Sequence, residues 1–369
     1  LPLPARVLVV PAGVGAVLDP AAREALADAR LPFRVAVAAR DLAPRGAHAA
    51  GLDADDLDAE GRDLLGNHLA EAADRPFRRL VGAEAGRSRA AADRGDVDDV
   101  AGALGPQYRQ CGAGEVHDAI EIGLDLGAEA VLGDMGSLED MIGAAEGAAA
   151  IYHISPNVHA RELEFGQTAV AAALKAGVPR FVFHSLCHPQ IESLPNHWLK
   201  LRVEEKIKES GLNFTILQPT PYMQNVLGQR QNILERGVYE IPYQPSTLLG
   251  MVDLDDVAEV AARVLLTPKT YDWATYELAG PEILSQTEVL HIIRLVTGKE
   301  IALKVISRED WCARAASTGM PQYAVSIFYR MFEFMESSGF WGNPGVLEWL
   351  LERKARRFEA WFRAVGNWS

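Results

Sequence analysis

The sequence predicts an α/β fold, with a doubly wound parallel sheet in the first part of the chain and a smaller, mostly helical region after it. Short apolar runs rich in β-branched residues alternate with alanine-rich segments of helical periodicity. These runs are apolar throughout rather than at every second residue, which indicates strands buried on both faces of a sheet. With 369 residues, 49% of them hydrophobic, the chain is long enough to bury a large core.

Six apolar runs are the predicted strands. In chain order they span residues 6–11, 33–39, 128–133, 149–154, 180–184 and 213–218. Helical patterns fill most of the connections between them, as in 158–176 and 197–210. The alternation ends near residue 220, so we predict one domain over 1–220 and a second region over 221–369.

Residues 41–118 interrupt the alternation. They hold 16 acidic and 9 basic residues among many Ala and Gly, with few large apolar side chains. Such a segment contributes little core. We therefore predict a peripheral insertion between the second and third strands, partly irregular or formed of short surface helices.

The C-terminal region carries two helix signals. The stretch "SQTE", Ser285 to Glu288, fits a capping box that opens a helix. Residues 322–363 are rich in aromatic residues at helical spacing, which is typical of core packing. The alternative interpretation is a lid over an apolar ligand.

Composition argues against several classes of partner. The net charge of −14 disfavours nucleic-acid and anionic-membrane surfaces, which need clustered Lys and Arg. There is no apolar run long enough to span a bilayer and no charged-then-apolar leader. Cys111, Cys187 and Cys312 form no C-x-x-C, which predicts a reducing compartment without disulfides or a zinc site. We predict a cytoplasmic protein.

The first strand leads into the loop "PAGVGAVLDP" and then a helix, the arrangement in which a Rossmann-type fold binds a dinucleotide pyrophosphate. A complete fingerprint has three glycines, for a tight turn, close phosphate approach and helix packing. Here Gly15 falls on the pattern, Ala12 takes the first position and Leu18 the third. Gly13 adds flexibility and Asp19 adds a negative charge. The loop predicts a weakened cofactor site.

Further candidate cofactor contacts stand at strand ends. Arg40 ends the second strand, where an arginine suits the 2′-phosphate of NADP. The alternative interpretation is that Arg40 has no cofactor role and is one of several exposed arginines. Asp134 ends the third strand, where an adenine edge would lie, although helix capping near Ser137 also explains the polar residues there. Ser155 and Pro219 directly follow the predicted fourth and sixth strands and complete the predicted set. We therefore predict NADP as the cofactor.

The stretch "FVFHSLCHPQIESLPNHWLKLRVEEKIKESGLNFTILQPTPYMQN" resembles the NmrA-like family of atypical short-chain dehydrogenases. The resemblance continues through "GMVDLDDVAEVAARVL", "ATYELAGPEILSQTEV" and "GFWGNPGVLEWLL". It covers roughly residues 120–360 well and 5–40 loosely, whereas 41–118 has no counterpart. The resemblance implies a Rossmann-type NAD(P)-binding domain and a smaller C-terminal substrate region.

Short-chain dehydrogenases place a Ser at the end of the fifth strand and then a Tyr and a Lys four residues apart. By resemblance, Ser185 takes the Ser position and Lys200 the Lys position, which contacts the nicotinamide ribose. The Tyr position is Asn196, which cannot exchange a proton near neutral pH, although it can orient a substrate oxygen. The structural alternative for Lys200 is a surface charge paired with Glu204.

Other side chains can replace the missing proton donor. His184, His188 and His197 cluster around the end of the fifth strand, and Tyr222 follows the sixth strand. Ligands of open α/β sheets bind at these carboxyl ends, and histidine exchanges protons readily at physiological pH. His197, Tyr222 and His188 are therefore candidate catalytic residues beside Ser185 and Lys200.

The leading hypothesis is an NADP(H)-dependent oxidoreductase that reduces a carbonyl or conjugated alkene of an apolar small molecule. The Ala- and Arg-rich composition suggests a role in specialised metabolism. A non-redox tailoring enzyme, using the histidines for cyclisation, isomerisation or elimination, is the alternative. A cofactor-sensing regulatory protein is the second alternative. The sequence leaves open whether the protein forms a homo-oligomer.

Overall fold

The computed structural model describes residues 6–10, 33–38, 129–156, 158–267 and 269–366, the first two segments and 129–132 by their backbone only. The chain divides into two units, one formed by Leu1–Ala38 with Leu126–Ser369 and the other by Ala39–Asp125. The second unit lies outside the described residues. The predicted insertion over 41–118 lies within it and stays a prediction.

The main sheet has seven parallel strands in the order β3-β2-β1-β4-β5-β6-β9. Their bounds are β1 Arg6–Val10, β2 Phe33–Ala38, β3 Glu129–Gly133, β4 Ala148–His153, β5 Arg180–His184, β6 Asn213–Pro219 and β9 Ala274–Leu278. The fold class and all six predicted strands are confirmed. The seventh strand, β9, comes from the C-terminal region and was not predicted. The strand order reverses between β1 and β4, and ligands of such sheets bind beyond the carboxyl ends near this point.

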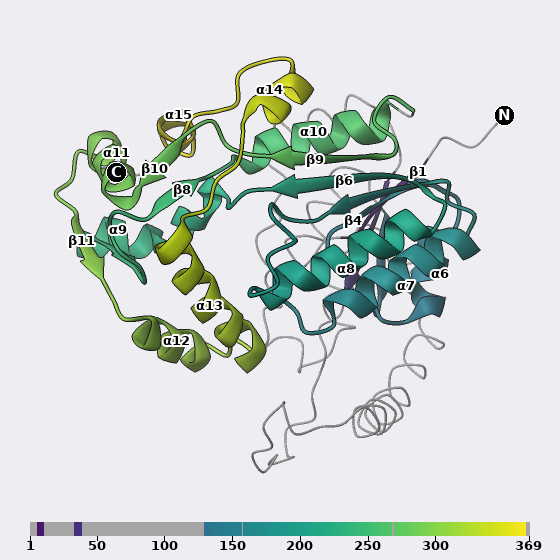
Figure 1. Ribbon diagram of the computed structural model, residues 1–369, viewed down its shortest axis with the longest axis horizontal. Helices are drawn as coiled ribbons and strands as arrows, with labels where there is room; N and C mark the ends of the chain where they lie inside the picture. Colours follow the sequence, from purple (N-terminus) through teal and green to yellow (C-terminus); the bar gives the residue numbers. More distant parts are fainter. Residues whose placement is uncertain (1–5, 11–32, 39–128, 157, 268, 367–369) are drawn as a thin grey trace, which may run out of the picture. The chain divides into compact units, whose positions relative to one another are not determined.

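One face of the sheet is covered by α6 (Leu138–Ala145), α7 (Glu162–Lys175) and α8 (Pro195–Glu209) (Figure 1). Phe181 and Phe183 of β5 belong to the core beneath these helices. Helices α7 and α8 approach closely at Gly166, where an added Cβ would lie 2.5 Å from the Val203 methyl groups. Helix α8 begins two residues earlier than predicted because Pro195 is accommodated in a first helical turn.

The other face carries α10 (Leu254–Leu266) and α14 (Gly345–Leu351). Val182 of β5 and Leu217 of β6 lie in the core on this side. All five residues of β5 are buried. Strands covered on both sides explain why the sequence shows continuous apolar runs.

The C-terminal region adds two small sheets and a helical cluster with its own core. Its elements are η1 Met223–Gln229, α9 Arg230–Arg236, β7 Val238–Ile241, β8 Leu248–Gly250, β10 Ile283–Ser285, α11 Gln286–Thr297, β11 Ala302–Val305, α12 Arg308–Ser317, α13 Gln322–Ser338 and α15 Phe358–Ala364. The predicted capping box is confirmed, because the Ser285 hydroxyl accepts from the Glu288 N–H and the Glu288 carboxylate accepts from the Ser285 N–H. Phe358, Trp361 and Phe362 are buried, as expected for core aromatics. The lid interpretation stays a prediction.

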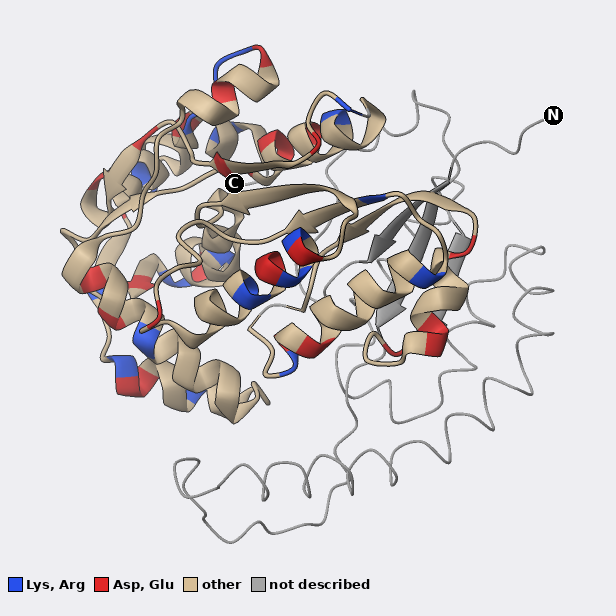
Figure 2. Cartoon of the chain, turned by 45° about the vertical axis from the view of Figure 1, so that its right-hand side comes forward, with Lys and Arg blue, Asp and Glu red and all other residues tan. Residues whose placement is uncertain are grey.

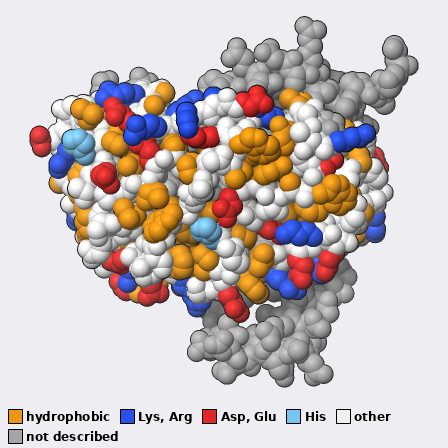
Figure 3. Space-filling model, turned by 45° about the horizontal axis from the view of Figure 1, so that its top comes forward, with side chains coloured by type: hydrophobic (Ala, Val, Ile, Leu, Met, Phe, Trp, Pro, Cys, Tyr) orange, Lys and Arg blue, Asp and Glu red, His pale blue; other side chains and the backbone are white. Residues whose placement is uncertain are grey.

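Acidic and basic positions are mixed along the described helices (Figure 2). On the face drawn in Figure 3, they lie interspersed with apolar side chains rather than gathered into one basic surface. No described helix combines the length and apolar character needed to cross a membrane.

Candidate active site

Lys200 of α8 is fixed beneath the end of β5. Its ammonium lies 2.9 Å from the Glu162 carboxylate, with the two side chains 12% and 3% exposed. It also donates to the His184 carbonyl at 3.5 Å and lies over the Phe183 ring. The interpretation as a surface lysine paired with Glu204 is therefore wrong. An ammonium has three N–H donors, so one remains without a partner among the described residues.

Ser185 lies directly after β5 and is buried. Its hydroxyl donates to Glu204 Oε1 at 2.6 Å, and Gln218 Nε2 donates to the same oxygen at 2.7 Å. Glu204 is almost fully buried, and these hydrogen bonds compensate its lost hydration. Because the Ser185 proton is engaged by a carboxylate, the hydroxyl oxygen can act toward a ligand only as a hydrogen-bond acceptor.

Asn196, in the position of the missing Tyr, is buried in the first turn of α8. Its amide nitrogen makes a long contact of 3.7 Å to the Met331 sulfur. Its Oδ1 has no hydrogen-bond partner among the described residues. A buried amide oxygen without a partner is costly, so this atom is a candidate acceptor for a ligand donor.

A continuous hydrogen-bonded chain runs across the ends of three strands. Tyr152 of β4 contacts His184 Nδ1 at 2.6 Å, and Tyr222, after β6, contacts His184 Nε2 at 2.7 Å. Burial and the Lys200 charge lower the pKa of His184 to about 3, and burial raises the pKa of both tyrosines. A neutral imidazole has one donor and one acceptor, so one tyrosine donates to the ring and the other accepts from it.

A second buried histidine, His153, ends β4. Its Nε2 lies 3.0 Å from the Ser155 hydroxyl, and its Nδ1 has no partner among the described residues. Burial, with a smaller effect of Lys200, lowers the pKa of His153 to about 3. Ser155 is thus held by a neutral ring at the end of β4, where the sequence predicted a cofactor contact.

His188 and His197 shape the loop that follows β5. His197 Nδ1 donates to the His188 carbonyl at 3.0 Å, and burial lowers the pKa of His197 to about 4. His188 Nε2 donates to the Trp341 carbonyl at 2.8 Å. His197 is therefore neutral at pH 7, with Nε2 available as an acceptor rather than as a proton donor.

The remaining predicted contacts have local structural partners. Asp134 Oδ1 accepts from the Gly136 N–H at 2.8 Å, and Ser137 caps α6 as expected. The Pro219 carbonyl accepts from the Cys187 N–H at 2.8 Å, which ties the end of β6 to the loop after β5. The other predicted cofactor residues lie outside the described residues: Ala12, Gly13, Gly15 and Arg40.

Residues 114–368, which include every described residue of this site, match the NmrA-like family. The chain belongs to this family.

Two curated relatives of this NmrA-like protein are named as an azoreductase and a quinone oxidoreductase. The NAD(P)H azoreductase of Xenophilus azovorans is 25% identical over 240 residues, which cover 64% of this chain and 82% of that protein. Quinone oxidoreductase 2 of Escherichia coli (strain K12) is 26% identical over 188 residues, which cover 51% of this chain and 65% of that protein.

Solved structures share the fold at low identity. The Escherichia coli NADPH-dependent quinone oxidoreductase complexed with NADPH has a TM-score of 0.65 and 16% identity, over 98% of this chain and 100% of that chain. The Citrobacter sp. triphenylmethane reductase complexed with NADP(H) has a TM-score of 0.63 and 16% identity, over 96% and 98% of the two chains. These likenesses support the Rossmann-type architecture.

Sequence reasoning missed three residues of this NmrA-like site, Tyr152, His153 and Glu162, and assigned Glu204 only as an alternative partner of Lys200. The Tyr-His pair was visible as a polar interruption of the apolar run "AAAIYHIS". Nothing in the sequence signalled that Glu162 and Glu204 are buried, because acidic residues on amphipathic helices are ordinarily solvated.

Proposed function

We propose that this chain is an NADP(H)-dependent oxidoreductase that reduces a carbonyl or conjugated double bond of a largely apolar small molecule. The single observation that carries the proposal is the Tyr152–His184–Tyr222 chain, which brings an exchangeable proton to the end of β6. This chain supplies the exchangeable proton that Asn196, in the position of the missing Tyr, cannot supply. Family membership and the named reductase relatives support the same chemistry. A cytoplasmic location and a role in specialised metabolism belong to the proposal.

The described residues fit a nicotinamide nucleotide at the ends of β4 and β5. Lys200 has an N–H free for a ribose hydroxyl, and Ser185 presents acceptor lone pairs. Asn196 Oδ1 is a buried acceptor without a partner among the described residues, suited to a carboxamide or hydroxyl donor. When bound, NADPH supplies a hydride.

The chain's own residues supply the proton. In one tautomer Tyr152 donates to His184 Nδ1, and the Nε2–H donates to the Tyr222 oxygen, which leaves the Tyr222 proton directed to the substrate. When Tyr222 gives up this proton, His184 passes its Nε2 proton to Tyr222 and receives the Tyr152 proton on Nδ1. The imidazole thus stays neutral before and after transfer, which suits its low pKa. The transfer leaves the negative charge on the Tyr152 oxygen, and because burial raises the pKa of Tyr152, this oxygen takes up a proton from solvent before the next turnover.

The first experiment measures whether dialysed protein binds NADPH, NADP and NADH. Lys200→Met should weaken NADPH binding, whereas the exposed lysine variant Lys206→Met should not. A protein that binds none of the nucleotides refutes the proposal.

The second experiment measures turnover of quinones, azo compounds and conjugated enones with deuterium-labelled NADPH. Tyr222→Phe should lower kcat by about 100-fold, the usual contribution of a positioned acid, with unchanged NADPH affinity. Tyr329→Phe is the matched control, because Tyr329 donates to Glu309 on the surface. Conversion of the substrate without NADPH and without a two-hydrogen mass gain would establish the non-redox alternative. NADPH binding with no turnover of any acceptor would favour a cofactor sensor.

A further inference from the structure

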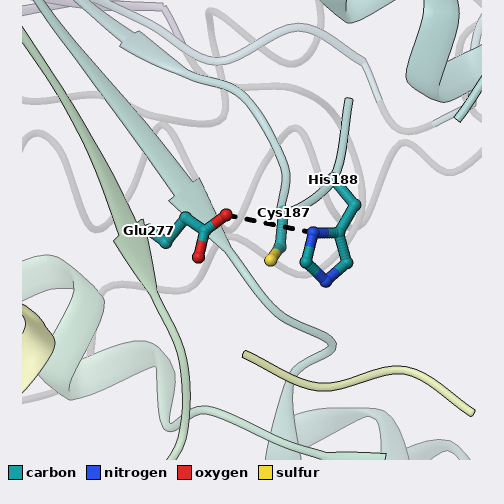
Figure 4. A group of neighbouring side chains, drawn as sticks. All are labelled: Cys187, His188 and Glu277. Carbon is teal, nitrogen blue, oxygen red and sulfur yellow. Dashed lines mark ion pairs between the residues drawn. The ribbon is translucent and has the colours of Figure 1, made fainter. Parts of the chain in front are cut away.

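Three potential metal ligands of different chemistry converge beside the candidate active site. Cys187 and His188 follow β5, and Glu277 lies on β9, which is separated from β5 by β6 in the sheet (Figure 4). One atom from each, a thiol sulfur, an imidazole nitrogen and a carboxylate oxygen, lies within 4.8 Å of the other two. The proposed reduction uses none of these three side chains.

The tautomer of His188 leaves a lone pair directed into this cluster. The Trp341 carbonyl, 2.8 Å from His188 Nε2, can only accept, so the ring proton resides on Nε2. His188 Nδ1 lies 3.9 Å from Glu277 Oε1, which is too long for a hydrogen bond. Metal-binding histidines characteristically donate their other ring N–H to a carbonyl or carboxylate, which is the arrangement seen here.

The backbone holds the three groups in place. The Cys187 N–H donates to the Pro219 carbonyl, and Glu277 stands opposite Gln218 in the β6–β9 pairing. His188 has φ +56°, a left-handed conformation that a residue with a side chain adopts at an energetic cost. Strained backbone of this kind concentrates at functional sites.

The separations suit a small tetrahedral ion. With about 2.0–2.1 Å to nitrogen or oxygen and about 2.3 Å to sulfur, ligand atoms around Zn²⁺ lie about 3.4–3.6 Å apart. Side-chain shifts of about 1 Å would close the cluster to this geometry. Cys187 is fully buried, whereas the His188 and Glu277 side chains are 29% and 43% exposed. The solvent side therefore leaves room for a fourth ligand such as water.

We propose that Cys187, His188 and Glu277 form a mononuclear site for a divalent cation of the Zn²⁺ class, with one open coordination position. A thiolate, a neutral imidazole and a carboxylate balance the double charge of the ion, and this mixture of donors favours Zn²⁺ over Mg²⁺ or Ca²⁺. On binding, the Cys187 thiol proton passes to solvent as the sulfur–metal bond forms.

The test titrates the chelator-treated protein with Co²⁺, which reports thiolate ligation by a near-ultraviolet charge-transfer band, and then displaces the Co²⁺ with Zn²⁺. We expect one Co²⁺ per chain with visible bands of tetrahedral intensity. Cys187→Ser should abolish the charge-transfer band, and Glu277→Gln should weaken Co²⁺ binding at least 10-fold. The matched control, Cys111→Ser with Cys312→Ser, removes the other thiols and should leave the band unchanged.

Circular dichroism checks that each variant is folded. If Cys187→Ser does not fold, the half-exposed Glu277→Gln variant carries the test. The proposal is overturned if the native chain shows no stoichiometric thiolate band, if the band survives in folded Cys187→Ser, or if Glu277→Gln binds Co²⁺ with unchanged affinity. Loss of the band in the control variant also overturns it, because the ligand would then be another cysteine.

Discussion

Replacing Lys200 by Met should destabilise the fold as well as impair cofactor binding. Methionine keeps an unbranched apolar side chain against Phe183 but removes the ammonium from Glu162, whose side chain is 3% exposed. Loss of one partner of a buried ion pair costs about 3–5 kcal/mol, because a buried charge is left uncompensated. Lys200 itself is 12% exposed, so we expect the lower end of this range, about 3 kcal/mol.

The assay is urea unfolding followed by tryptophan fluorescence. With an m-value near 3 kcal/mol/M, a loss of 3 kcal/mol lowers the midpoint by about 1 M. Lys206→Met is the matched control on the same helix, because Lys206 and Glu209 form an exposed pair whose loss costs about 0.5 kcal/mol or less.

A double-mutant cycle separates the structural role of Lys200 from its binding role. Glu162→Gln removes the buried charge, so the double variant should recover about 2 kcal/mol relative to the sum of the single variants. Nucleotide affinity should stay low, because the lysine is still missing. Strict additivity of the two stability changes, or a loss below about 1 kcal/mol in Lys200→Met, would refute the buried-pair reasoning.

Three further predictions concern packing, acid stability and cofactor choice. Gly166→Ala places a methyl group 2.5 Å from Val203, and thermal unfolding should show a loss of about 1–3 kcal/mol from overpacking; an unchanged midpoint would contradict the close approach of α7 and α8. Burial lowers the pKa of His153 and of His184 to about 3 in the folded protein, against an ordinary 6.5. Their contribution to the free energy of unfolding is therefore complete above pH 6.5 and is lost as the pH falls toward 3. Urea midpoints that stay constant from pH 7 to 4.5 would exclude neutral buried rings. If Arg40 pairs with the 2′-phosphate, as the sequence predicts, Arg40→Ala should weaken NADP binding far more than NAD binding in parallel titrations. Equal losses would remove Arg40 from that role.

The sequence by itself determined six of the seven described strands of the main sheet and the starts of two helices. Six continuous apolar runs predicted six strands, because burial on both faces of a parallel sheet requires apolar residues at every position. The Ser137 and Ser285 caps were also readable, since a cap joins residues three apart in the chain. Apolar runs and helix caps depend on residues that are close together in the chain, so the sequence was sufficient to predict them.

The partners of the candidate site residues were decided by the tertiary structure. Helical spacing offered Glu204 as the alternative partner of Lys200, yet the fold gives Lys200 the carboxylate of Glu162, 38 residues away, and gives Glu204 to Ser185. Likewise β9 joins the sheet beside β6 and brings Glu277 to His188, 89 positions earlier in the chain. Strand order and helix docking set such contacts through long-range burial, and the periodicity of a single segment holds no information about them.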